Sequence, residues 1–398
     1  MSEPIPEDNA TSKPAMSPET IAELKAIAQK DKPSAQEPDP DKTSNWEQYY
    51  RKNQTNESED DMNDENFEKA WSMYAGYDEY YQRVNEQRAA SGKVAIEKFG
   101  LGNEVTIIAS INVDPVSGKA IDGHDYHPEA RSMRDIEEAW QKYLSETPPE
   151  ERFVIFEGNS ESFSDRDTAI RQRTEAGMMM YHADQEGVER TTGEPSDLVV
   201  AEELEKAGIT REETALLFTL RSLATHASSE PIGDMSKNFY PHMASVGFEG
   251  FPQYKEEQKK VFEQDKDGKF VDNSPEAVEQ RAQINREIFD KIVPFVDKWN
   301  EALESYGLPK LSVSEDQEIV FEESVSRGDV AKSSNPAGEG QHSERMAQMT
   351  AIRDRHIFET IVEATKSGRK PFVVYGGSHV VSLEPTLKQY YGSQRVLE

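Results

Sequence analysis

A short apolar run near the C-terminus restricts the fold of this chain more than any other feature. The run, Phe372 to Tyr375, is aromatic and β-branched and does not alternate with polar residues, which is typical of a strand buried on both faces of a sheet. Gly376 and Gly377 then permit a tight turn, and Ser378 and His379 follow. We therefore expect His379 just past the carboxyl end of a central strand, where ligands bind in open α/β sheets. The alternative is that His379 only hydrogen-bonds the turn.

Two earlier segments have the same form. A strand is predicted over residues 104–113, and a second over 152–156, which ends in Glu157 and Gly158. Helical periodicities separate the three strands, so the sequence predicts an α/β fold with a mostly parallel central sheet layered by helices. An acid at the end of a buried strand makes Glu157 a candidate site residue; a solvated carboxylate or a helix cap is the alternative.

The helices and loops of the chain are predicted from periodicity and from capping residues. Helices are expected over about 64–90, 165–184, 198–207 and 210–223, then from Ser274 with a kink at Pro294 and an end at Gly307, then over 343–368, with a last short helix capped by Ser382. The segment Thr191 to Pro195 is interpreted as a turn. Residues 226–273 are predicted to be an irregular insertion, and residues 324–342 a mobile loop that could act as a lid.

Composition divides the chain into a tail and a folded part. Residues 1–62 are rich in Pro, Ser, Asn, Asp and Glu, so they are predicted to be a disordered acidic tail. Residues 63–398 are predicted to form one α/β domain with the two insertions. Two apolar islands in the tail, Ile21 to Ile27 and Trp46 to Tyr50, could dock on a protein partner or on the folded domain itself.

Charge and residue usage exclude several classes of function. The formal net charge is −31, which argues against nucleic acid or an anionic membrane as a partner. The chain has no cysteine, so a metal would have to be held by His, Asp or Glu. The sequence has no secretion signal and no run of roughly 20 apolar residues, so a cytoplasmic location is expected. The signatures of P-loop, dinucleotide-binding, zincin and serine-hydrolase sites do not follow the predicted strands.

Three short motifs occur in an order that resembles a known superfamily. They are Phe156-Glu157-Gly158 after a strand, Arg353-Asp354 with Ile357, Phe358 and Ile361 along a helix, and Gly376-Gly377-Ser378-His379. This order resembles the superfamily that groups TraB/PrgY-like proteins, TIKI-type metalloproteases, erythromycin esterases and ChaN-like proteins. The resemblance implies that a sheet-end Glu, a helix Arg and a late His surround one cleft. This chain departs from the pattern at Asn112, where such proteins usually have His, and at Asp354, where they usually have Asn.

The candidate residues can be given chemical roles. Glu157 and His379 could hold a divalent cation such as Mn, Zn or Co, with Asp114, His124 or His127 as a third ligand and water in the open position. Without metal, His379 could act as a general base that Glu157 orients. Arg353 would stabilise an oxyanion or bind a substrate carboxylate.

The sequence leaves three functions open. The first is a hydrolase of ester or peptide bonds that acts on a small molecule or a peptide. The second is a non-catalytic protein on the same fold that binds a small ligand or haem, as the ChaN branch of the resemblance implies. The third is an interaction scaffold whose acidic tail recruits a partner.

Overall fold

The computed structural model describes residues 65–76, 95–100, 104–110, 112–113, 120–121, 126–224, 231–248, 251, 260–263 and 270–392. Every described residue belongs to one compact unit, which spans residues 44–398. The predicted tail, 1–62, therefore lies outside the described residues, as do its two apolar islands. None of the helices within the described ranges is long and apolar enough to cross a membrane.

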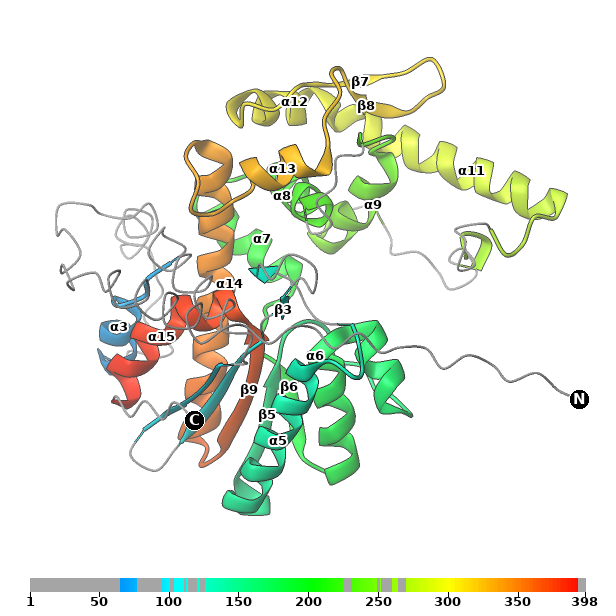
Figure 1. Ribbon diagram of the computed structural model, residues 1–398. Helices are drawn as coiled ribbons and strands as arrows, with labels where there is room; N and C mark the ends of the chain where they lie inside the picture. Colours follow the sequence, from blue (N-terminus) through cyan, green and yellow to red (C-terminus); the bar gives the residue numbers. More distant parts are fainter. Residues whose placement is uncertain are drawn as a thin grey trace, which may run out of the picture. The chain divides into compact units, whose positions relative to one another are not determined.

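The main sheet has five strands in the order β1-β2-β9-β5-β6. Its central strand, β9, comes from the C-terminal part of the chain. β9 pairs in parallel with β2 on one side and with β5 on the other, β6 is parallel to β5, and β1 is antiparallel to β2. The predicted α/β fold with a mostly parallel sheet is thus confirmed (Figure 1). The strands are β1 (Ala95–Phe99), β2 (Val105–Ser110), β5 (Arg152–Phe156), β6 (Glu189–Thr192) and β9 (Lys370–Gly376).

Helices cover both faces of this sheet. Phe372 and Val374 of β9 face one hydrophobic core, and Val373 and Tyr375 face the other. Burial on both sides explains why the run has no polar alternation. The first core is closed by α5 (Arg131–Glu146) and α6 (Arg166–Glu186), and the second by α3 (Glu65–Trp71), α14 (Gln341–Lys366) and α15 (Gly377–Tyr391) (Figure 1).

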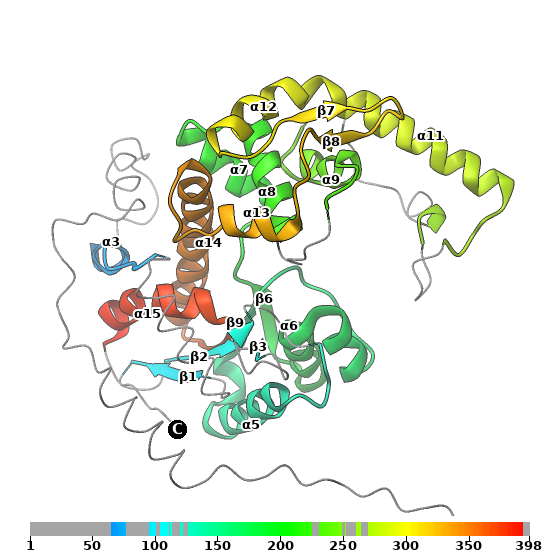
Figure 2. The same ribbon diagram turned by 45° about the horizontal axis from the view of Figure 1, so that its top comes forward.

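Helical insertions lie between β6 and α14 and have a hydrophobic core of their own. Trp299 is at its centre, where it stacks on Phe239 at 3.7 Å between ring centroids and donates from Nε1 to the carbonyl of Glu212 at 2.9 Å. Met346 and Met349, near the start of α14, join the same core. The elements, shown in Figure 2, are α7 (Asp197–Lys206), α8 (Arg211–Ala224), α9 (Ser236–Ser245), α11 (Pro275–Ile292), η3 (Val293–Phe295), α12 (Val296–Ser305), β7 (Leu311–Val313), β8 (Ile319–Phe321) and α13 (Arg327–Ser333).

Several predicted boundaries were wrong near the N-terminal end of the sheet. The helix expected over 64–90 ends at Trp71, and residues 77–94 lie outside the described part. The strand expected over 104–113 stops at Ser110, because its partner Gly376 is the last residue of β9. Asn112–Val113 (β3) instead pairs with Ala120–Ile121 (β4) in a separate two-stranded sheet.

The two predicted insertions are more regular than expected. Residues 226–273 contain α9, whose Phe239 and Met243 are fully buried. Residues 324–342 contain α13, which begins with a capping box between Ser326 and Asp329, a start signal that sequence reasoning overlooked. The helix expected from Ser274 is confirmed, with its break at η3 around Pro294.

Candidate functional site

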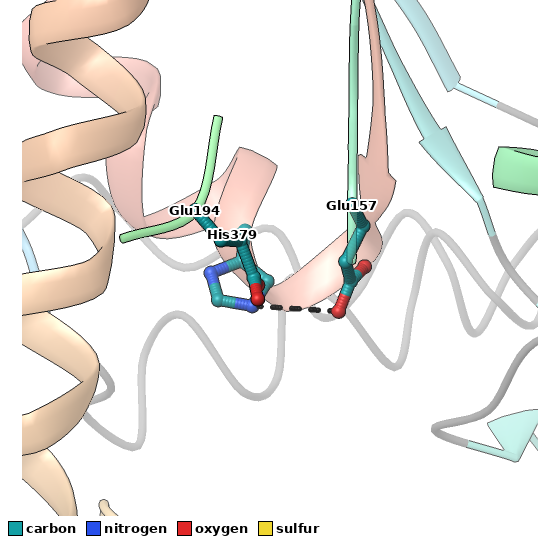
Figure 3. A group of neighbouring side chains, drawn as sticks. All are labelled: Glu157, Glu194 and His379. Carbon is teal, nitrogen blue, oxygen red and sulfur yellow. Dashed lines mark ion pairs between the residues drawn. The ribbon is translucent and has the colours of Figure 1, made fainter. Parts of the chain in front are cut away.

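Three side chains meet at the carboxyl edge of the sheet. Glu157 follows β5, Glu194 lies two residues after β6, and His379 lies in the first turn of α15, directly after β9. β9, β5 and β6 are neighbours in the sheet. Each side chain offers one ligand atom such that all three atoms lie within 4.8 Å of one another, and Figure 3 shows the imidazole of His379 facing the carboxylate of Glu157.

A buried carboxylate holds the imidazole of His379. The Nδ1 atom of His379 hydrogen-bonds Oδ1 of Asp354, whose side chain is completely buried in α14. The other oxygen of Asp354 accepts from the hydroxyls of Tyr74 at 2.5 Å and Ser382 at 2.7 Å. With Nδ1 donating to Asp354, Nε2 is left facing Oε1 of Glu157 at 4.0 Å. The orienting role that we expected of Glu157 therefore belongs to Asp354.

Ser382 was predicted to cap the last helix, and that prediction was wrong. α15 begins at Gly377, so Ser382 lies inside the helix, one turn after His379. The Gly-Gly pair does not lead into a loop; instead the chain passes directly from β9 into the helix. This turn places His379 at the helix start and directs Ser382 to the same carboxylate, Asp354.

The pKa of His379 reflects two opposing effects. Burial of the side chain disfavours the imidazolium form and lowers the pKa, but the charge of Asp354 and its hydrogen bond outweigh burial, so the pKa of His379 is raised from its ordinary value. A contact of this kind between a carboxylate and Nδ1 fixes the tautomer and increases the basicity of the other ring nitrogen. Nε2 is thus suited to bind a cation or to accept a proton.

The carboxylate of Glu157 is held by a backbone N–H of β9, and the loop that follows Glu157 is fastened by β6. Its Oε2 accepts from the backbone N–H of Gly376 at 2.9 Å, which joins the end of β5 to the end of β9. The loop after Glu157 is fastened by Arg190 of β6, whose guanidinium donates to Oγ of Ser160 at 2.7 Å and to the carbonyl of Glu161 at 2.6 Å. Glu157 is therefore presented by a braced turn rather than by a free surface loop.

Arg353 lies next to the third member of the cluster. Its guanidinium forms an ion pair with the carboxylate of Glu194, and the side chain of Arg353 is buried. Arg353 and Asp354 are consecutive residues of α14, so one helix contacts both Glu194 and His379. The positive charge that we predicted for the site, Arg353, is present, and it is paired with Glu194, a carboxylate that the sequence did not single out.

Tyr375 lies under the loop that carries Glu194. Its phenol is 1% exposed, its Oη has no hydrogen-bond partner among the described residues, and its ring meets that of His379 edge-on at 5.7 Å. Burial, with the charges of Glu194 and Glu157, raises the pKa of Tyr375 well above its ordinary value, so the phenol stays protonated. A Cβ on Gly193 would lie 2.4 Å from this Oη, which explains why a residue without a side chain precedes Glu194.

The structure brings together the three residues predicted as catalytic, Glu157, Arg353 and His379. Asp114 and His124 lie outside the described residues, so their predicted ligand roles stay predictions. His127 is exposed and does not belong to the cluster.

Sequence reasoning missed Glu194 and the role of Asp354. Glu194 follows a strand whose residues, Glu-Arg-Thr-Thr, carry no apolar signal because β6 is at the edge of the sheet. The sequence did hold one signal for Glu194. A predicted helix is followed by the β-branched pair Thr191-Thr192 and then by Gly193-Glu194-Pro195, which is the order of a helix, a short strand and a strand-end acid. Asp354 was noticed only as a departure from the usual Asn, and its contact with His379 could not be inferred from spacing.

The donor set matches the preferences of a divalent cation. Two carboxylates and an imidazole nitrogen suit Zn, Mn and related ions, and Asp354 supplies the carboxylate that normally supports a ligating histidine. Three carboxylates, Glu157, Glu194 and Asp354, surround one guanidinium and one imidazole, so the site has an excess of negative charge. The group Glu157, Glu194 and His379 could hold a metal ion.

The chain matches no protein-family model, and no curated protein or solved structure shows a match to it. Any conclusion about function therefore rests on the chemistry of the site.

Proposed function

We propose that this protein is a divalent-metal-dependent hydrolase of ester or peptide bonds. The observation that supports the proposal is the convergence of Glu157, Glu194 and His379 from three adjacent strand ends, with Asp354 behind the imidazole. Catalytic metal sites commonly combine three protein ligands with an open position. The order of the three motifs, which resembles the TraB, TIKI, erythromycin esterase and ChaN-like superfamily, also favours hydrolysis of an ester or a peptide bond.

Each residue has a defined part in the proposed reaction. Glu157, Glu194 and His379 bind the ion, for which Mn, Zn and Co are the candidates, and Asp354 holds His379 in the tautomer that leaves Nε2 available. When bound, such an ion polarises a carbonyl group and lowers the pKa of water. Arg353 places a fixed positive charge next to Glu194, where it can stabilise the oxygen that becomes negative during attack on the carbonyl.

The metal site is tested by titrating the metal-free protein with Mn²⁺ or Zn²⁺ in a calorimeter. We expect one ion per chain in the wild type and loss of that ion in both Glu157→Gln and His379→Gln. Glu137→Gln is the matched control, because Glu137 contacts His182 Nε2 at 2.9 Å and pairs with Arg166 outside the site. Equal binding in Glu157→Gln and in the wild type would contradict the proposal.

Hydrolysis is tested with the same proteins. We expect the metal-loaded wild type to cleave p-nitrophenyl acetate or a casein-derived peptide, and we expect EDTA and Glu157→Gln to abolish that cleavage. Stoichiometric metal with no turnover of either class of substrate would contradict the hydrolase and would favour the non-catalytic binding protein.

A further inference from the structure

The segment before the sheet packs tightly against the helices that carry the site. Phe67 of α3 stacks on Phe358 of α14 at 4.8 Å between ring centroids, and Trp71 stacks on Tyr74 at 4.5 Å. Glu68 pairs with Arg355 of α14 at 2.8 Å. The contacts with Phe358 and Arg355 fix this segment on α14, the helix that supplies Asp354.

Tyr74 brings this segment into contact with the site. Its hydroxyl donates to Oδ2 of Asp354 at 2.5 Å, and its side chain is 2% exposed. The next residue, Ala75, donates its backbone N–H to the carbonyl of Ser382 at 3.3 Å. The segment therefore contacts both the carboxylate that holds His379 and the other hydroxyl residue that serves this carboxylate.

Asp354 needs these donors because it is a buried carboxylate. Removing an ionised carboxylate from water is costly unless hydrogen bonds and charges compensate. Three described side chains, Tyr74, Ser382 and His379, contact its two oxygens. Tyr74 is the one of these three that does not come from α15, and it shares Oδ2 of Asp354 with Ser382, so it joins residues 65–76 directly to this carboxylate.

We propose that Tyr74 is a positioning residue for His379, acting through Asp354, and that residues 65–76 thereby complete the site. The consequence for metal binding depends on the proposed function, whereas the effect on the imidazole does not. Residues that support metal ligands from behind typically change metal affinity by about 10- to 100-fold when they are altered. The segment before the sheet is thus a functional part of the site as well as a packing element.

Tyr74→Phe removes the hydroxyl and keeps the ring that stacks on Trp71. Tyr306→Phe is the matched control, because the hydroxyl of Tyr306 also donates to a carboxylate, Oε1 of Glu213, at 2.7 Å, and Tyr306 is also buried. In full-length protein titrated with Mn²⁺, we expect Tyr74→Phe to weaken binding about 10- to 100-fold. We expect Tyr306→Phe to bind Mn²⁺ as the wild type does.

A second readout is independent of metal. In metal-free protein labelled with ¹⁵N at histidine, the imidazole signals of His379 are assigned by their loss in His379→Gln. We expect Tyr74→Phe to shift these signals and Tyr306→Phe to leave them unchanged. A purely structural role for Tyr74 would lower the melting temperature of Tyr74→Phe without moving the His379 signals.

The outcomes separate the two proposals. If the wild type binds no Mn²⁺ but Tyr74→Phe shifts the His379 signals, the proposed function fails and the positioning role stands. Unshifted His379 signals in Tyr74→Phe overturn the positioning role, whatever the wild type binds. If Tyr74→Phe does not fold, Tyr74→Leu is used, because it also removes the hydroxyl that contacts Asp354; unchanged His379 signals in that variant overturn the role equally.

Discussion

Gly193→Ala should disturb the site through a single steric contact. The added Cβ would lie 2.4 Å from Oη of Tyr375 and 2.9 Å from Cγ2 of Ile155, and both neighbours are buried. These separations are far below van der Waals contact, so either the Tyr375 ring or the loop that carries Glu194 must move. Overpacking of this kind costs about 1–3 kcal/mol. We therefore expect Gly193→Ala to lower the free energy of unfolding by that amount and to weaken Mn²⁺ binding, because Glu194 is displaced.

A double-mutant cycle, measured by denaturant unfolding, tests whether the clash with Tyr375 causes the loss of stability. Tyr375→Phe removes the closer of the two clashing atoms, and that atom has no hydrogen-bond partner among the described residues, so the double variant should recover about 1 kcal/mol or more. Gly233→Ala is the control, since a Cβ there meets nothing within 4 Å, and its stability should stay within about 0.5 kcal/mol of the wild type. Strictly additive effects of Gly193→Ala and Tyr375→Phe would refute the reasoning.

Three further predictions concern other parts of the described structure. Burial lowers the pKa of His342 to about 4, so the unfolded chain takes up a proton that the folded chain does not as pH falls from about 6.5 to 4. His342→Phe should thus remove up to about 3 kcal/mol of acid destabilisation in urea titrations across that window; identical pH profiles would contradict this. Trp299→Ala should cost about 3–5 kcal/mol by the same method, and a cost below 1 kcal/mol would contradict its central place in the helical core. Arg190→Met should weaken Mn²⁺ binding about 10-fold in calorimetry, because the loop after Glu157 loses its brace; unchanged affinity would show that Glu157 is held without Arg190.

The central strand could be predicted from sequence because its signal is local. Burial of β9 on both faces leaves an uninterrupted apolar run, and two glycines mark its end. The same reasoning located the end of β5 and therefore Glu157. The meeting of Glu157 with His379 was expected from the family resemblance, and it occurs because β5 pairs in parallel with β9, so that both strands end at the same edge of the sheet.

The rest of the site depends on contacts between distant segments, which spacing does not reveal. Tyr74 and Asp354 are 280 residues apart in the chain, and Arg353 and Glu194 are 159 apart. Glu194 escaped notice because the edge strand before it is polar. Tyr74 falls within the helix predicted over about 64–90, whereas α3 ends at Trp71, the Tyr74 ring packs on Trp71 and its hydroxyl reaches Asp354. Aromatic spacing alone does not distinguish such a residue from ordinary core packing.

The most direct test of the account is the position of a bound ion. Crystals of the protein soaked in Mn²⁺ can be measured for anomalous scattering, which locates the metal without assumptions about its ligands. We expect one strong peak about 2.0–2.3 Å from Nε2 of His379 and from one carboxylate oxygen each of Glu157 and Glu194. A structure at saturating Mn²⁺ with no peak between these three side chains, or with its peak elsewhere, would contradict the account.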